Sequence, residues 1–307
     1  MAILDVLKKR GYTIVISEHR IHYLKDIADR AILIEHGKIK REISREEFQK
    51  LSNSDANEMG LRSMNLLSIK PHPFDFPKKG NDFVCLDRIS YRYGKNDVIL
   101  ENVKISAARG DVVGIVGHNG VGKSTLLEIV CGLKKEMGGS FLIDGKPASP
   151  KIRNRDTFLV MQNSDYQLFT ESVEKELYLG SGKDQALRQK GLALLEKMGL
   201  SDYLQQHPAS LSGGQKQRLC IAVACMKNTD VICFDEPTSG LDYISMKNVS
   251  SLLHDLSEEG KVLFVTSHDY EFLLSTCTHI CHLKSGSVAD YFEVKEETAH
   301  QIYQILF

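Results

Sequence analysis

Short apolar runs alternate with amphipathic stretches along most of the chain. The runs are bounded by polar or glycine residues, which is typical of strands buried in a sheet. The stretches between them repeat apolar residues at helical spacing, as residues 183–198 do with Leu187, Leu194 and Leu195. This alternation predicts an α/β domain with a mainly parallel core sheet. Its strands are expected at 111–116, 157–161, 230–234 and 262–265, and its further helices at 171–179, 213–226 and 243–258.

A different pattern precedes the first of these strands. Residues 83–90 and 98–107 alternate apolar and polar positions, which predicts antiparallel strands joined through residues 91–96. Residues 140–145 follow the pattern of another strand, ending in a turn at Gly145. We therefore expect an antiparallel β portion in addition to the parallel sheet.

An internal repeat links the two ends of the chain. Residues 11–39 align without a gap with residues 260–288, at a constant offset of 249 positions. His19 meets His268 in this alignment, and both segments predict strand, histidine turn, helix, strand and glycine turn. Two unrelated strand–helix–strand segments are the alternative interpretation.

The repeat predicts a division of the chain into three parts. Residues 1–62 would be the C-terminal remnant of a first copy, with a helix over 3–10 and strands at 13–16 and 31–34. Residues 63–81, which carry three prolines, would form an extended linker. Residues 82–307 would form a complete second copy.

Composition narrows the class of protein. The 307 residues are 42% hydrophobic and 26% charged, with a formal net charge of -1, as in an ordinary soluble protein. This charge gives no support for a nucleic-acid-binding surface. No apolar stretch approaches the roughly 18 residues of a membrane span, so a role at a membrane would require a partner. The seven cysteines include no C-x-x-C pair, which favours reduced, buried thiols over a zinc site.

The most informative motif is the glycine-rich sequence G-H-N-G-V-G-K-S-T at residues 117–125. It lies between a predicted strand and a predicted helix, the context of a phosphate-binding loop. Backbone N–H groups of the loop and the start of the helix would surround a phosphate. Lys123 would reach the β- and γ-phosphates, and Ser124 would ligate Mg²⁺. The predicted ATP-binding residues here are Gly117, His118, Asn119, Gly120, Val121, Gly122, Lys123, Ser124 and Thr125.

A pair of carboxylates supports the same chemistry. Asp235 and Glu236 follow the apolar run 231–234, at the strand end where open α/β sheets bind ligands. Asp235 would hold Mg²⁺ together with Ser124. Glu236 would polarise a water molecule aimed at the γ-phosphate.

Further motifs resemble those of the ATP-binding cassette (ABC) ATPases. The sequence L-S-G-G-Q at 211–215 resembles the family's signature motif, and F-D-E-P-T-S-G-L-D at 234–242 resembles its Walker B motif and D-loop. Tyr93 is similar to the adenine-stacking aromatic residue, although Tyr91 remains an alternative, and Gln162 and His268 are similar to the Q-loop glutamine and the switch histidine. The resemblance covers about 83–290 and implies a P-loop cassette with an antiparallel β subdomain and a helical subdomain.

The resemblance also implies roles for these residues. Two cassettes pack head to tail in this family, so that Ser212, Gly213, Gly214, Gln215 and Asp242 contact the ATP held by a second cassette. Catalysis would involve Lys123, Gln162, Glu236 and His268, and Mg²⁺ would be held by Ser124, Gln162 and Asp235.

The region after Gln162 resembles that of energy-coupling-factor and cobalt-type importer ATPases, because it contains the run Q-L-F at 167–169. The resemblance implies an ATPase at the cytoplasmic face of the membrane that energises import of a vitamin or metal ion through permease subunits. Leu168 and Phe169 would help to receive a helix of the permease, or else belong to the core of the helical subdomain. A soluble ABC ATPase that acts on ribosomes or DNA is the alternative function.

His19 departs from the family pattern. It resembles a switch histidine, yet residues 1–62 contain no phosphate loop, no signature motif and no Asp-Glu pair. We expect either a truncated tandem protein or a missing half that another polypeptide supplies.

Overall fold

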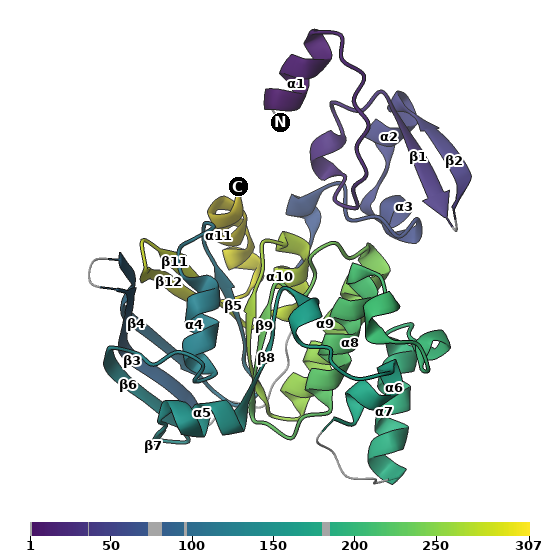
Figure 1. The fold of residues 1–307 in the computed structure, drawn as a ribbon. Helices are drawn as coiled ribbons and strands as arrows, with labels where there is room; N and C mark the ends of the chain where they lie inside the picture. Colours follow the sequence, from purple (N-terminus) through teal and green to yellow (C-terminus); the bar gives the residue numbers. More distant parts are fainter. Residues whose placement is uncertain (1, 36, 73–81, 95–96, 180–184) are drawn as a thin grey trace. The chain divides into compact units, whose positions relative to one another are not determined.

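The computed structural model describes residues 2–35, 37–72, 82–94, 97–179 and 185–307 (Figure 1). Two compact units divide the chain. Unit 1 comprises Met1–Ile69 and Gly240–Met246, and unit 2 comprises Lys70–Ser239 and Lys247–Phe307. Residues 73–81 of the predicted linker lie outside the described residues, whereas Ser63, Met64 and Leu66 are buried in unit 1. The three-part division at 62 and 81 stays a prediction.

Unit 2 is built around a six-stranded sheet with the order β12-β11-β5-β10-β9-β8. Its neighbouring strands are parallel except for the antiparallel pair β11 and β12. The mainly parallel sheet predicted from the alternating pattern is therefore confirmed. The strands are β5 (Val112–Val116), β8 (Thr157–Val160), β9 (Val231–Asp235), β10 (Val262–Thr266), β11 (His279–Lys284) and β12 (Ser287–Glu293).

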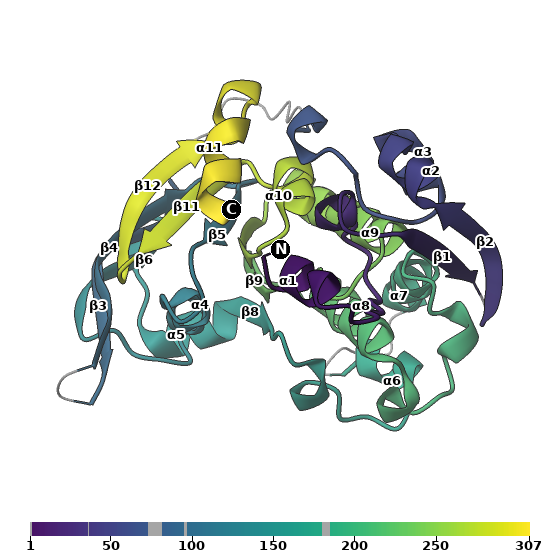
Figure 2. The same ribbon diagram turned by 90° about the horizontal axis from the view of Figure 1, so that it is seen from above.

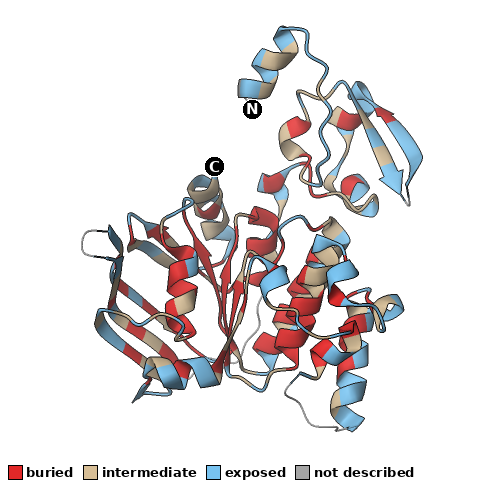
Figure 3. Cartoon of the chain, viewed as in Figure 1, coloured by how far each residue is buried: buried red, intermediate tan, exposed pale blue. Residues whose placement is uncertain are grey.

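Helices on both sides explain why the central strands are so apolar. The helix α4 (Lys123–Val130) lies on one side of the sheet and α8 (Gly213–Cys225) on the other (Figures 1 and 2). Every residue of β5 and β10 is buried, as expected for parallel strands covered on both faces (Figure 3). The remaining helices around this sheet are α9 (Tyr243–Glu258), α10 (Tyr270–Thr276) and α11 (Glu296–Leu306).

The antiparallel portion is a separate four-stranded sheet with the order β4-β3-β6-β7. The strands β3 (Val84–Tyr93) and β4 (Asp97–Ala107) agree closely with the predicted ones, and β6 (Gly138–Ile143) and β7 (Lys146–Pro147) complete the sheet. A helix that we did not predict, α5 (Pro150–Asp156), follows it and is capped by Ser149.

The helical portion lies between β8 and β9 in the sequence. It contains α6 (Val173–Leu177), α7 (Gln185–Lys197) and α8, with 3₁₀ helices η3 (Ser164–Tyr166), η4 (Ser201–Tyr203) and η5 (Pro208–Ser210). Residues 183 and 184 of the predicted helix 183–198 lie outside the described residues. Within the described ranges, no helix combines the length and apolar character that crossing a bilayer requires.

Unit 1 has its own small core but little other buried surface (Figure 3). Its hairpin consists of β1 (Arg30–Glu35) and β2 (Lys38–Ser44). Unit 1 also contains short helices, two of which begin with capping boxes at Ser44 and Ser52. The helices are α1 (Ala2–Lys9), η1 (His22–Leu24), α2 (Arg45–Lys50), α3 (Asn53–Glu58) and η2 (Leu66–Ser68).

The hairpin of unit 1 repeats the hairpin of unit 2 residue for residue. Adding 249 to Arg30–Glu35 and Lys38–Ser44 gives the bounds of β11 and β12. The pair Arg30↔Ser44 becomes His279↔Glu293, and the register shift after Leu33 becomes the shift after His282. Such agreement in pairing supports a true internal repeat over two unrelated segments.

The predicted strand at 13–16 is wrong. These residues form no strand, and Val15 is 93% exposed. Their counterpart, β10, forms backbone hydrogen bonds with β5 on one side and β9 on the other. The described part of unit 1 contains no counterpart of either neighbour, so an isolated extended segment has no ladder to join.

Candidate nucleotide site

The loop at 117–122 requires its glycines. Gly117, Gly120 and Gly122 have φ values of 148°, 81° and 109°, in the region that residues with a side chain rarely adopt. A Cβ atom on Gly117 would lie 2.3 Å from the carbonyl oxygen of Leu283, and one on Gly122 would lie 2.9 Å from Leu100 Cδ2. The backbone can therefore close over a small anion only because these side chains are absent.

Lys123 interacts both with this loop and with the carboxylates at the end of β9, the second strand from β5 in the sheet. Its Nζ donates to the carbonyl oxygens of Gly117 at 2.8 Å and His118 at 3.2 Å. Burial lowers the pKa of Lys123, while the charges of Glu236 and Asp235 oppose that shift. The fold thus brings together the lysine and the two carboxylates that the sequence assigned to one site.

Asp235 and Glu236 are fixed by a residue that the sequence analysis missed. Thr266 Oγ1 donates to Asp235 Oδ1 at 2.5 Å and accepts from the backbone N–H of Glu236 at 2.9 Å. Glu236 adopts a left-handed backbone conformation, with φ 49°. Thr266 pairs with Asp235 at the same level of adjacent parallel strands, so the strand prediction contained a usable signal.

His268 faces Glu236. Its Nε2 lies 3.5 Å from Glu236 Oε1, and the side chains are 38% and 14% exposed respectively. A partly exposed histidine beside a nearly buried carboxylate can contact a ligand that enters from solvent. The predicted pairing of these two residues in one site agrees with this geometry.

Gln162 and Ser124 complete the predicted set of metal ligands. Both are exposed, Gln162 in the turn after β8 and Ser124 in the first turn of α4. Mg²⁺ prefers oxygen ligands and usually takes only one or two from the protein together with phosphate oxygens. The hydroxyl, amide and carboxylate oxygens of Ser124, Gln162 and Asp235 fit that preference. Among the described residues, no cluster of three or more His, Cys, Asp or Glu side chains forms a metal site.

Tyr93 is the more suitable of the two candidate stacking residues. It is 44% exposed, whereas Tyr91 is packed against the core cluster and meets Tyr93 edge to face, with ring centroids 5.2 Å apart. Hydrogen bonds from Lys134 and Thr125 lower the pKa of Tyr93. Lys134 in turn forms a 2.6 Å ion pair with Glu128 on α4.

The signature residues begin α8. Ser212 and Gln215 form a capping box, in which the Ser212 side chain accepts from the backbone N–H of Gln215 and the Gln215 side chain accepts from that of Ser212. Ser212 and Gly213 are exposed. Because α8 and α4 lie on opposite sides of the sheet, the signature and the phosphate loop of this cassette are separated (Figure 2).

Asp242 lies in the segment Gly240–Met246, which belongs to unit 1. Its Oδ1 accepts from the backbone N–H of Ser245 at 2.7 Å, at the start of α9. Its predicted contact with a nucleotide stays a prediction.

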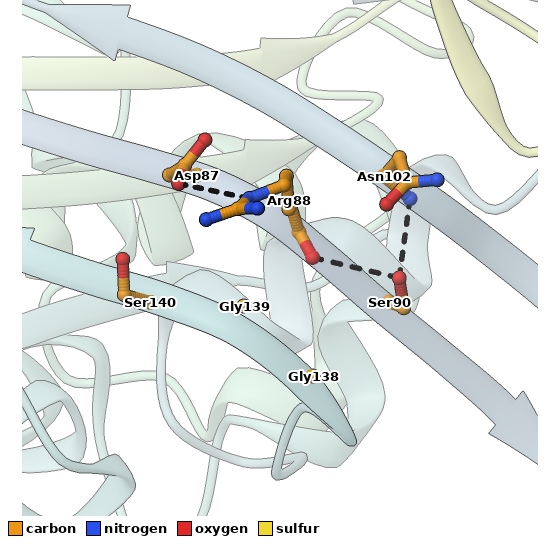
Figure 4. A pocket seen from close by; sticks show the side chains of 7 residues that line it. All are labelled: Asp87, Arg88, Ser90, Asn102, Gly138, Gly139 and Ser140. Carbon is orange, nitrogen blue, oxygen red and sulfur yellow. Dashed lines mark hydrogen bonds and ion pairs between the residues drawn. The ribbon is translucent and has the colours of Figure 1, made fainter.

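A cavity of about 470 Å³ lies on the antiparallel sheet, apart from the residues above (Figure 4). A hydrogen bond joins two of its lining residues, because Ser90 Oγ accepts from the backbone N–H of Asn102 at 3.1 Å. Its lining is Asp87, Arg88, Ser90, Asn102, Gly138, Gly139 and Ser140, none of which belongs to the predicted nucleotide site.

Comparisons with known proteins identify the family of the chain. Residues 100–239 match the family model described as ABC transporter. A protein of Thermotoga maritima named energy-coupling factor transporter ATP-binding protein EcfA1 is 35% identical over 209 residues, covering 67% of this chain and 80% of the relative. The solved structure of CbiO1 from Clostridium perfringens, part of an ABC transporter complex, superposes with a TM-score of 0.64 at 28% identity, covering 73% of this chain and 93% of that one.

Longer relatives match nearly the whole chain. A protein of Treponema denticola named as an ABC transporter ATP-binding protein is 38% identical over 295 residues, covering 95% of this chain. The chain spans 60% of the length of that relative.

Proposed function

The chain belongs to the ATP-binding proteins of ABC transporters, and from that membership we propose that it binds ATP and hydrolyses it to ADP and phosphate. The observation that carries the proposal is the convergence of Lys123, Asp235, Glu236 and His268. Burial lowers the pKa of Lys123 while the charges of Glu236 and Asp235 act on the same group in the opposite direction, and His268 Nε2 lies 3.5 Å from Glu236 Oε1.

Each residue has a distinct task in the proposed reaction. The loop N–H groups and Lys123 bind the phosphates, and Glu236 accepts a proton from the water that attacks the γ-phosphorus. His268, beside Glu236, contacts the γ-phosphate and helps to hold that water. Mg²⁺, held by Ser124, Asp235 and Gln162, would neutralise charge on the phosphate oxygens.

The reaction requires two cassettes. The signature at 211–215 and the phosphate loop lie on opposite sides of one sheet, so each loop is completed by a signature from a second cassette. That second cassette is either another copy of this chain or a homologous chain.

We further propose that the protein is the ATPase subunit of an energy-coupling-factor importer, bound peripherally to permease subunits at the cytoplasmic face of the membrane. The similarity to EcfA1 and to CbiO1 supports this class over a soluble ATPase acting on ribosomes or DNA. The cargo would be a vitamin or a metal ion, selected by the membrane partners.

Residues 1–62 are proposed to belong to a first cassette of the same kind. The support is the repeated hairpin of unit 1, with the register and bulge of β11 and β12. In a complete first cassette, a strand equivalent to β5 would insert between β1 and residues 13–16.

Substitutions at the convergent residues test the ATPase. Lys123→Ala should weaken ATP binding by about tenfold or more in calorimetry, because a charged partner of the phosphates is lost. Lys146→Ala, at an exposed lysine of β7, is the control and should bind as the parent does. Unchanged ATP affinity in Lys123→Ala would contradict the assignment of the phosphate site.

Glu236→Gln separates binding from turnover. It should keep ATP affinity and lower the rate of phosphate release by roughly 10²-fold or more, because the amide accepts no proton. Glu196→Gln, at an exposed glutamate of α7, should have the parental rate. A parental rate in Glu236→Gln would exclude Glu236 as the general base.

A further inference from the structure

Gln167 forms an unusual pair of hydrogen bonds with the end of β8. Its side-chain Oε1 accepts from the backbone N–H of Met161 at 2.7 Å, and its Nε2 donates to the carbonyl oxygen of Leu159 at 2.6 Å. Both bonds are partly buried. A single carboxamide therefore bridges the two residues on either side of Val160.

The position of β8 at the edge of the sheet explains which backbone groups this bridge satisfies. β8 is an edge strand, paired with β9 up to Val160↔Phe234. In a parallel ladder, one residue of a neighbouring strand accepts from residue i+1 and donates to residue i−1. Gln167 makes the same two bonds to Met161 and Leu159. Its side chain therefore satisfies the backbone groups that a further strand would pair with at the edge of the sheet.

An uncharged carboxamide has the two groups that this bridge requires. Glutamine carries a donor and an acceptor on one planar group, whereas an ionised glutamate accepts only. Gln162, the predicted ligand of the metal and the attacking water, is the next residue after Met161. The bridge thus fixes the backbone immediately before Gln162, which lies beyond the last paired residue of β8.

The rest of the segment 161–170 is also anchored. Glu176, only 1% exposed, accepts through Oε2 from the backbone N–H groups of Phe169 at 3.1 Å and Thr170 at 2.8 Å. Asp165 forms a 2.7 Å ion pair with Lys216 on α8. The segment is therefore held to β8, α6 and α8, although Phe169 itself is 73% exposed.

We propose that Gln167 is a positioning residue for Gln162, whose carboxamide bridge sets the geometry of the catalytic turn after β8. This inference rests on the proposed ATPase function. Gln167 touches neither substrate nor metal in this role; it acts through the backbone of Met161. Loss of the bridge would displace Gln162 without changing the phosphate loop, so turnover should fall while ATP affinity is retained.

The test combines kinetics with a double-mutant cycle. Gln167→Met removes both hydrogen bonds at similar side-chain volume, and Gln167→Glu removes only the donor. Each should lower kcat by between about tenfold and about 100-fold with little change in KM for ATP, the scale expected for a small misplacement. Gln205→Glu is the matched control, because Gln205 bonds Glu174 on the exposed surface, and it should have the parental kcat.

The double variant decides between positioning and a general structural role. If Gln167 acts through Gln162, then Gln162→Ala combined with Gln167→Met should be no slower than Gln162→Ala alone. Additive losses, or a parental kcat in both Gln167 variants, would overturn the proposal.

Hydrogen exchange tests the bridge independently of catalysis. The Met161 amide should exchange faster in Gln167→Met than in the parent, and an unchanged rate would also overturn the proposal. Failure of the proposed function is recognised separately. If the parental protein shows no ATPase activity when assembled with its second cassette, while the Met161 amide still exchanges faster in Gln167→Met, the ATPase and the catalytic role of the bridge are refuted but the bridge itself is not.

Discussion

Residues 13–16 and the strand β10 occupy equivalent places in the two copies of the repeat, yet only one of them is a strand. Val15 is 93% exposed, whereas Phe264, its counterpart at the offset of 249, is completely buried. β10 pairs with β5 and β9, and the described part of unit 1 offers neither neighbour. The same apolar pattern therefore gives a strand only where other parts of the chain complete the sheet.

The two hairpins, in contrast, form in both copies of the repeat. β1 pairs with β2, which follows it closely in the sequence, as β11 pairs with β12, and both pairs have the same register. The two strands of each hairpin are close in the sequence, so they can pair without a distant segment between them. The comparison separates elements that local sequence specifies from those that require a distant partner.

The largest difference between the two copies is expected in how much a core substitution lowers the free energy of unfolding. Phe264→Ala should lower the free energy of unfolding by about 3–5 kcal/mol, because it opens a cavity between packed layers. Val15→Ala should change it by less than about 0.5 kcal/mol, because that side chain already faces solvent. Urea denaturation followed by circular dichroism measures both, and similar effects would contradict the contrast in burial.

The two histidines provide the next comparison. His268→Ala should lower the steady-state ATPase rate by about 100-fold, as expected when a group that contacts the reacting atoms is lost. His19→Ala should leave the rate of the purified chain unchanged, because residues 1–62 contain no phosphate loop beside it. Equal losses in the two variants would mean that His19 serves the same site as His268.

The smallest expected difference is between the destabilising effects of alanine at the two turn glycines. Gly37 and Gly286 have φ values of 74° and 78°, so alanine at either costs about 1–2 kcal/mol in backbone strain. A Cβ atom at Gly286 would also lie 2.5 Å from the carbonyl oxygen of Ile99, whereas one at Gly37 meets no neighbour. Gly286→Ala should therefore destabilise the chain by about 1–3 kcal/mol more than Gly37→Ala, as read from thermal unfolding. Identical melting shifts would argue against that close approach.

Elements with strong patterns could be predicted from the sequence. The helix 243–258 and the strands of the parallel sheet agree with the structure to within two residues, because their apolar spacing is set by burial. The family and its fold were likewise predicted correctly from the motifs. The helix α5 was missed, although Ser149 followed by Pro150 is a recognisable helix start.

The supporting residues could not be predicted in the same way. Thr266, Gln167 and Lys134 act by hydrogen bonds or ion pairs that depend on three-dimensional neighbours. Their residue types occur at many positions without such roles, so no spacing identifies Gln167 or Lys134, and only the ends of the predicted strands point to Thr266. The helix expected after the histidine turn of the first copy is only the 3₁₀ turn His22–Leu24, whereas the equivalent helix of the second copy is α10, Tyr270–Thr276.

The capping box of α8 has a consequence for how the signature motif meets an anion. The backbone N–H of Ser212 is already bonded to Gln215 Oε1 at 2.8 Å, so it is not a free donor. The Ser212 hydroxyl, however, gives only a lone pair to the cap and keeps its proton. That proton, with the N–H groups of Gly213 and Gly214, remains for a phosphate. Capping of the helix and binding of a phosphate thus use different atoms of the motif. The capping hydrogen bonds do not have to break for the phosphate to bind.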